Sequence, residues 1–194
     1  MNHYFQTPAR PNERHEVQAN IWGHEFTFTT SGGVFSASGL DKATAILLSQ
    51  PPPEAEHILD LGCGWGPIAV AIAACTGASV TAIDVNEEAL DLCRINAERA
   101  GVADLVNCLP PEEVAEGTLF DEIWSNPPIR IGKPALHSLL LHWLPRLKPS
   151  GVARIVVGKN LGADSLQTWL INQGFHCERA ASKKTYRVLE MRHR

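Results

Sequence analysis

The 194-residue chain lacks several features that would assign it to a class at once. No apolar run approaches the roughly 20 residues of a membrane-spanning helix. The first 16 residues contain no apolar segment of the kind that a secretory signal requires. With 44% hydrophobic and 20% charged residues, the composition excludes an intrinsically disordered chain. We therefore expect one folded domain that acts in the cytoplasm and has no membrane partner.

The cysteines and histidines show no metal or disulfide pattern. The five cysteines are odd in number and widely spaced, and none forms a CxxC pair. His137 and His142 are the nearest histidines on a predicted helix, but a spacing of five residues separates them by about 140° around the axis. We expect reduced thiols and no bound metal.

Charge is also low, with 17 basic residues against 21 acidic ones and a net charge of −4. A protein that wraps nucleic acid over its whole surface would be strongly basic. Any binding of nucleic acid must therefore use a local basic patch.

The pattern of apolar residues predicts a loose arm over 1–16, an N-terminal extension over 17–50 and a core over 57–194. In the extension we expect two short strands between Val17 and Thr30 and a helix over 40–49. In the core, the predicted strands are 57–61, 79–84, 105–108, 122–125, 152–157, 175–179 and 185–191, and the helices are 67–75, 87–100, 134–147 and 165–173.

Strands that alternate with helices indicate a mostly parallel sheet. The last two strands have no helix between them, so they should pair as an antiparallel hairpin at one edge. The predicted fold is thus α/β, with a Rossmann-like, seven-stranded, mostly parallel sheet, an antiparallel C-terminal strand and a short N-terminal β-extension. Residues 17–194 would form a single domain.

The segment Asp60-Leu61-Gly62-Cys63-Gly64-Trp65-Gly66-Pro67 joins a buried strand to a helix. Its GxGxG spacing differs from the GxGxxG fingerprint of nicotinamide-binding proteins. Asp60 lies below the glycine turn, where it could receive a ligand ammonium, and Asp84 ends the next strand, where its two oxygens suit a ribose diol. Two alternatives are an ordinary glycine turn and a helix-capping role for Asp84. The ligand that fits both ends is S-adenosylmethionine, and its expected contacts are Phe35, Asp60, Gly62, Cys63, Gly64, Gly66, Asp84, Val85 and Asn126.

The strand over 122–125 ends in the catalytic candidates Asn126, Pro127, Pro128 and Ile129. The Asn126 side-chain oxygen and the Pro127 carbonyl can accept both hydrogens of an exocyclic amine or an amide. That contact would orient the nitrogen for in-line attack on a methyl group, with proximity and polar preorganisation supplying most of the rate. An ordinary turn after a strand is the alternative interpretation.

Together these motifs resemble the class I S-adenosylmethionine-dependent methyltransferases, and more narrowly their RsmC-like (methyltransferase small) family. The resemblance covers about residues 20–192 and is carried by 33–36, 39–41, 60–66, Asp84, 125–130 with 132–133, and 183–187. It implies guanine-N2 methylation of 16S ribosomal RNA, with ribosomal RNA or the small ribosomal subunit as partner. It also implies that residues 33–36 lie over the cofactor.

The chain departs from that family at two points. Ile129 stands where many amino-methyltransferases have an aromatic residue that stacks on the base, so Phe35 is a candidate for stacking. The extra N-terminal domain of two-domain members has no counterpart in this sequence. The candidates for RNA contacts are loop or strand-end cations, which could equally be ordinary solvated charges: Arg130, Lys133, Lys159, Lys183, Lys184 and Arg187.

Two other functions stay open at this point. The same Asn-Pro-Pro chemistry would suit a protein glutamine amide or a DNA adenine amino group. A non-catalytic module that binds S-adenosylmethionine or RNA is the alternative outside the enzymes, although the intact Asn126 argues against it. The sequence predicts no oligomeric state.

Overall fold

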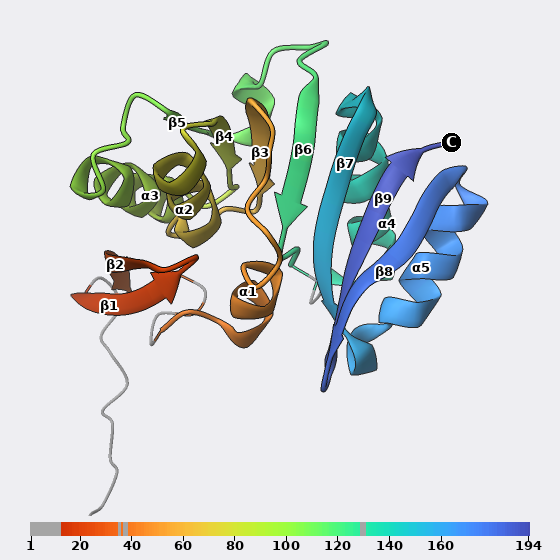
Figure 1. The fold of residues 1–194 in the computed structure, drawn as a ribbon, viewed down its shortest axis with the longest axis horizontal. Coiled ribbons are helices and arrows are strands. Elements are labelled where there is room, and N and C mark those ends of the chain that lie inside the picture. The colour runs from red at the N-terminus through yellow and green to blue at the C-terminus, as the bar shows by residue number, and fades with distance from the viewer. Residues whose placement is uncertain (1–12, 35, 37–38, 129–130) are drawn as a thin grey trace, which may run out of the picture.

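The computed structural model describes residues 13–34, 36, 39–128 and 131–194. Figure 1 shows a sheet with helices on both faces and a separate hairpin near the N-terminus. The strands are β1 (Arg14–Ile21), β2 (His24–Ser31), β3 (His57–Leu61), β4 (Ser79–Ile83), β5 (Val106–Leu109), β6 (Phe120–Ser125), β7 (Leu147–Gly158), β8 (Phe175–Lys183) and β9 (Tyr186–His193). The helices are α1 (Lys42–Leu47), α2 (Pro67–Thr76), α3 (Glu87–Arg99), α4 (Lys133–Trp143) and α5 (Ala163–Asn172), with short 3₁₀ turns η1 (Pro111–Glu113), η3 (Leu144–Arg146) and η4 (Lys159–Leu161).

The main sheet confirms the predicted fold class. Its seven strands follow the order β5-β4-β3-β6-β7-β9-β8. The five strands from β5 to β7 are parallel, whereas β9 runs antiparallel to both β7 and β8. The strand order reverses between β3 and β6, and ligands of open α/β sheets bind at the carboxyl ends of the strands beside such a reversal.

Two apolar layers cover the sheet. One contains α2, α3 and the β1–β2 hairpin, and the other contains α4 and α5. Every residue of α2 from Pro67 to Ala73 is buried, because this helix lies between the sheet and the hairpin. A helix enclosed in this way is apolar all round rather than amphipathic. The position of α2 fixes the loop that precedes it.

The hairpin is attached to that loop by its own side chains. Phe28 on β2 packs edge-on against Trp65 of the glycine segment, with ring centroids 5.0 Å apart. The buried Asn96 of α3 donates to the carbonyls of Thr29 at 2.9 Å and Trp65 at 2.7 Å. Its Oδ1 accepts the Thr29 N–H at 2.6 Å. These contacts hold the hairpin against the glycine segment and α3.

Two predicted boundaries differ from the structure near the N-terminus. The first strand begins at Arg14, so Arg14 to Glu16 belong to β1 and not to the predicted arm, because they pair with Ser31 to Thr29 of β2. The helix predicted over 40–49 is limited to Lys42–Leu47, because Asp41 caps its start and Pro51 follows its end. Residues 1–12 of the predicted arm lie outside the described residues. None of the described helices is long and apolar enough to cross a membrane.

Candidate active site

The carboxyl ends of β3 and β6 meet at a hollow beside the strand reversal. Segments that are distant in sequence line it: the turn after β2, the start of α1, the glycine segment after β3 and the residue after β6. Its lining consists of Ser36, Asp41, Thr44, Gly62, Cys63, Gly64, Trp65, Pro67, Ile68 and Asn126. The predicted cofactor and catalytic motifs therefore meet in one place, as the sheet topology requires.

The glycine segment makes a tight turn that side chains would oppose. Gly62, Gly64 and Gly66 have φ angles of 79°, 54° and 87°, in the left-handed region that favours glycine. At Gly66 a Cβ would also lie 2.4 Å from Sγ of Cys93, which is too close for any side chain. The turn thus brings bare backbone to the hollow, as contact with a ligand requires.

Asp60 lies beneath this turn with no exposed surface. Its Oδ2 accepts the N–H of Ala69 in the first turn of α2 at 3.0 Å. Oδ1 is buried and has no partner among the described residues. Burial raises the pKa of Asp60 to about 8, the hydrogen bond from Ala69 lowers it, and the charge of Asp84 raises it further. A cationic ligand group beside Oδ1, reached directly or through water, would relieve this penalty, so the residue fits the predicted ammonium contact.

Asp84 is held at the edge of the same turn. Its Oδ2 accepts the N–H of Gly64 and its Oδ1 accepts the N–H of Asn86, both at 2.9 Å. The cap of α3 is Asn86, whose side chain accepts from Glu88, so the capping alternative for Asp84 is wrong. Each carboxylate oxygen keeps a second lone pair, which suits two neighbouring hydroxyls. Val85 is 88% exposed, and its apolar side chain suits the face of an adenine base.

Asn126 lies on the opposite side of the hollow, directly after β6. Its Nδ2 donates to Oδ2 of Asp41 and to Oγ1 of Thr44, each at 3.0 Å. The preceding residue, Ser125, is buried and donates to the carbonyl of Leu61 at 2.7 Å, which ties β6 to the start of the glycine segment. With both amide hydrogens occupied, Oδ1 of Asn126 is the end of the side chain left for a substrate.

The rest of the Asn-Pro-Pro-Ile segment is described only in part. Pro127 is buried and Pro128 is exposed. A Cβ on Gly62 would lie 4.0 Å from Cδ of Pro128, so the proline loop contacts the glycine turn. Ile129 and Arg130, and the stacking candidate Phe35, lie outside the described residues.

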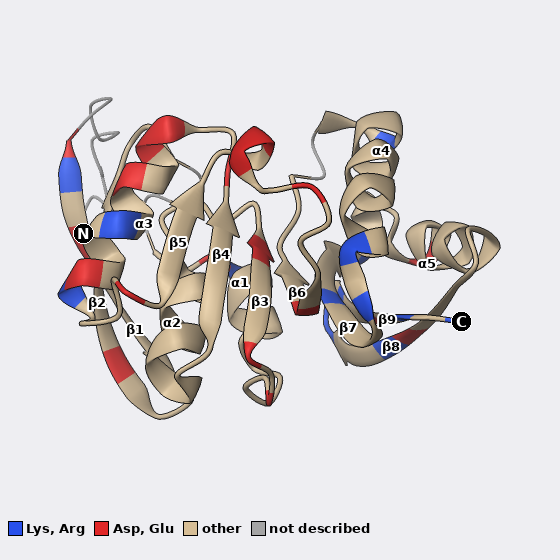
Figure 2. Ribbon diagram, turned by 90° about the horizontal axis from the view of Figure 1, so that it is seen from above, with Lys and Arg blue, Asp and Glu red and all other residues tan. Residues whose placement is uncertain are grey.

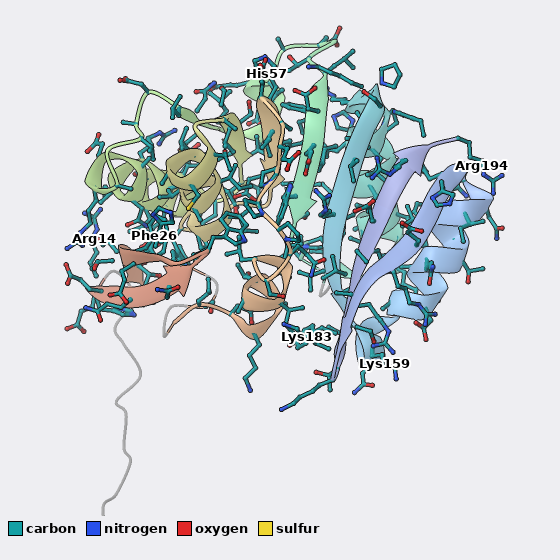
Figure 3. The ribbon with its side chains drawn as sticks, in the orientation of Figure 1. Arg14, Phe26, His57, Lys159, Lys183 and Arg194 are labelled. Carbon is teal, nitrogen blue, oxygen red and sulfur yellow. The ribbon has the colours of Figure 1, made fainter. Side chains whose placement is uncertain are left out.

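The predicted RNA contacts divide into two groups. Lys133, Lys159, Lys183 and Lys184 are exposed, and Figure 3 places Lys159 and Lys183 at the end of the sheet toward which β6 points. Arg187 differs, because it is only 7% exposed. It pairs in β9 with Val157, which lies in the core covered by α4 and α5, so the prediction of a surface phosphate contact is wrong for this residue.

The thiol of Cys63 faces other thiols rather than a catalytic base. Cys63, Cys93 and Cys108 are buried, and the Cys63 thiol donates to the carbonyl of Gly64 at 3.5 Å and interacts with Cys93. The bond to Cys93 lowers the pKa of Cys63, but burial and the charges of nearby groups raise it to about 11. Such a thiol is a poor nucleophile. No group of described residues could hold a metal ion.

Two features of the site escaped the sequence analysis. Asp41 and Thr44 hold Asn126, although Asp41 is 85 residues away in the chain. Ser31, which precedes the glycine-rich turn after β2, is buried and donates to Glu88 of α3. Asn86 also reaches the carbonyl of Gly33 with its amide nitrogen, at 3.5 Å. In the sequence, Asp41 stands only within residues 39–41 of the family resemblance, which does not point to a partner on β6.

The strand order and the two motifs at the strand reversal are those of a class I methyltransferase. The methyltransferase small domain family has a sequence profile that matches residues 25–190. The chain therefore belongs to the methyltransferase small domain family, and it is RsmC-like.

Individual relatives support this assignment. The uncharacterized protein YbxB of Bacillus subtilis (strain 168) is 34% identical over 169 residues, which cover 84% of each chain. Ribosomal RNA small subunit methyltransferase C of Shewanella sp. (strain MR-4) is 30% identical over 161 residues, or 75% of this chain and 46% of that enzyme. The structure of the 16S rRNA N2 G1207 methyltransferase RsmC of T. thermophilus, in complex with AdoMet and guanosine, matches 95% of this chain and 52% of that chain. Its TM-score is 0.80 at 24% identity, a likeness of fold. This chain thus spans about half the length of the RsmC proteins that it matches.

Proposed function

We propose that this protein uses S-adenosylmethionine to methylate N2 of a guanine in 16S ribosomal RNA, and that it does so in the cytoplasm. The observation that carries the proposal is the Asn126 side chain, whose amide nitrogen is bound by Asp41 and Thr44. Its oxygen is therefore available at the hollow to accept a hydrogen from an amino group.

The residues around the hollow suit both ends of this cofactor. Asp84 would bind the ribose hydroxyls, Val85 would pack on the adenine, and the bare backbone of Gly62 and Gly64 would lie against the cofactor. The buried Oδ1 of Asp60 would be satisfied by its ammonium group. When bound, the cofactor supplies an electrophilic methyl group on a positively charged sulfur.

The chain's own residues would position the guanine amine. Asn126 Oδ1 and the Pro127 carbonyl would accept the two N2 hydrogens, which turns the nitrogen lone pair toward the methyl carbon. The cofactor, held by Asp60, Asp84 and the glycine turn, would supply its methyl group to N2 and would keep the electron pair of the broken S–CH₃ bond on sulfur. The methylated nitrogen is acidic, so its proton passes to water without a basic side chain. Orientation and fixed dipoles would supply the rate.

Charge along the chain supports a polyanionic substrate. Residues 147–194 contain nine basic and three acidic residues, whereas residues 1–146 contain eight basic and eighteen acidic ones. Figure 2 shows basic residues recurring on the half of the molecule that carries β7, β8 and β9, and acidic residues predominating over the half with α3, β3 and β4. Lys133, Lys159, Lys183 and Lys184 would contact RNA phosphates from the basic side. The net charge of −4 hides this asymmetry.

The names of the RsmC relatives suggest the target base, and the shorter length of this chain makes the substrate the main point to test. The experiment is transfer of a labelled methyl group to small ribosomal subunits, free 16S RNA, DNA and a protein extract, followed by nucleoside and amino-acid analysis. We expect label in N2-methylguanosine. Label in protein glutamine or in DNA adenine alone would overturn the RNA assignment, and binding of S-adenosylmethionine with no transfer to any of the four would indicate a non-catalytic module.

A further inference from the structure

The two ends of the Asn126 amide have opposite chemistry. The oxygen end accepts hydrogen bonds and can hold an amino group, whereas the NH₂ end would repel that group's hydrogens. The two orientations differ only by a rotation of the terminal amide. Methyl transfer as proposed above therefore requires an interaction that fixes which end of the amide faces the hollow.

Asp41 provides such an interaction, because a carboxylate can only accept hydrogen bonds. Its Oδ2 lies 3.0 Å from Nδ2 of Asn126. In the reversed orientation, the amide oxygen would face this carboxylate, and that contact would be repulsive. The hydroxyl of Thr44 lies at the same distance, but a hydroxyl can donate or accept, so it supports either orientation. The choice of orientation therefore comes from Asp41.

Asp41 is itself held rigidly. The same Oδ2 accepts the N–H of Ala43 at 2.9 Å and the N–H of Thr44 at 3.2 Å, which caps α1. Thr44 is 5% exposed, and α1 packs against β7 and β9. In Figure 1, α1 lies directly below the ends of β3 and β6. The carboxylate is thus fixed by the helix start and by the sheet, and it fixes Asn126 in turn.

We propose that Asp41, supported by Thr44, is a positioning residue that locks the Asn126 amide with Oδ1 facing the hollow where the substrate amine is methylated. This inference rests on the proposed methyltransferase function. It goes beyond that function by assigning to the cap of α1 a part in the chemistry. Asp41 needs no contact with cofactor or substrate for this role.

The alternative is that Asp41 only caps α1, and three substitutions separate the two roles. Asp41→Ser keeps a strong capping side chain that is too short to reach Asn126. Asp41→Asn can place one oxygen where Oδ2 lies, so it keeps both the cap and the acceptor. Thr44→Val removes the second acceptor without changing the shape of the side chain. Lys42→Ala, an exposed change in the same helix, is the matched control.

The kinetic experiment measures kcat and KM for methyl transfer and the cofactor Kd by calorimetry. We expect Asp41→Ser to lower kcat by about 10- to 100-fold, less than the roughly 100- to 1,000-fold cost of removing a preorganised polar contact itself. Thr44→Val should have a smaller effect in the same direction. Asp41→Asn should restore kcat to within about threefold of the native enzyme, and the cofactor Kd should stay unchanged in all variants. A kcat for Asp41→Ser equal to that of Lys42→Ala would overturn the positioning role.

A second readout needs no substrate. The side-chain NH₂ signals of Asn126, assigned by their loss in Asn126→Asp, report on the two hydrogen bonds through their chemical shifts and their exchange with water. We expect Asp41→Ser and Thr44→Val to shift these signals and to speed their exchange, and Asp41→Asn and Lys42→Ala to leave them close to native. Unchanged NH₂ signals in Asp41→Ser would refute the proposal that Asp41 holds the Asn126 amide. If the native protein transfers no methyl group, the proposed function fails, while the NMR result still decides whether Asp41 holds the amide.

Discussion

Replacing Asp60 by asparagine in the cofactor-free protein should remove a pH-dependent loss of stability. Asp60 is fully buried, and its Oδ1 has no partner among the described residues. Burial raises its pKa from 3.8 to about 8 in the folded chain. Because the side chain must lose its proton at high pH, the folded state is penalised where the unfolded state is not.

The sign and size follow from proton linkage. Between pH 3.8 and about 8 the folded state binds more protons than the unfolded state, so stability falls as pH rises. One group contributes at most about 1.4 kcal/mol per pH unit, or about 2.7 kcal/mol between about pH 5 and pH 7. Below pH 3.8 the penalty is absent, and above pH 8 it is fully present. The asparagine can still accept the Ala69 N–H, so it keeps the structural contact.

The assay is urea unfolding of the native protein and of Asp60→Asn across this pH range, without cofactor. Other groups titrate in the same window, so the quantity of interest is the difference between the two proteins at each pH. We expect Asp60→Asn to gain stability over the native protein as pH rises. Asp104→Asn, which changes an exposed carboxylate, should show no such trend. A constant difference between native protein and Asp60→Asn at all pH values would refute the reasoning.

Three further results are expected. Asn126→Ala should retain cofactor binding by calorimetry but lose at least about 100-fold in kcat, since it removes a preorganised polar contact; native turnover would remove its catalytic role. Asp84→Ala should weaken the cofactor affinity by about tenfold or more, because two hydrogen bonds to a charged group are lost; an unchanged Kd would contradict the ribose contact. Lys159→Ala and Lys183→Ala should each reduce the slope of log K for RNA binding against log salt by about 1. Lys148, at the opposite end of β7, pairs with Asp121, so Lys148→Ala should leave the slope unchanged. Equal slopes in all three variants would place the RNA elsewhere.

The core of the fold was predictable because its signals are local. The strand over 57–61 has the predicted bounds, and the two C-terminal strands pair as expected at the edge of the sheet. The α-helix predicted over 134–147 ends at Trp143 and continues as the 3₁₀ turn η3, because Pro145 has no N–H to donate to the carbonyl of Leu141. The strand predicted over 152–157 is longer in the structure, where β7 spans Leu147–Gly158. The prediction begins too late because Pro149 and Gly151 are residues typical of turns.

The residues of the site were predictable to the extent that each motif implies its own geometry. A glycine turn after a strand places Asp60 and Gly62 without knowledge of the rest of the chain, and the parallel sheet brings Asn126 to the same edge. Burial of a charged side chain is different, because it depends on neighbours from other elements. Arg187 looked like a surface cation in the sequence, but its side chain is buried where β9 pairs with β7.

The contact between Asp41 and Asn126 could not be predicted from the motifs, yet the role of Asn126 depends on it. The Asn-Pro-Pro pattern states which side chain is available, but it cannot state which end of the amide faces the substrate. That choice is made by a carboxylate 85 residues away, held by the start of a six-residue helix. The amide oxygen accepts a hydrogen bond from an amine N–H, whereas the amide NH₂ group would repel the hydrogens of the amine. The orientation therefore decides whether Asn126 can hold an amine at all. The short helix before the core should therefore be considered part of the catalytic apparatus, and Asp41→Ser is the substitution that tests it.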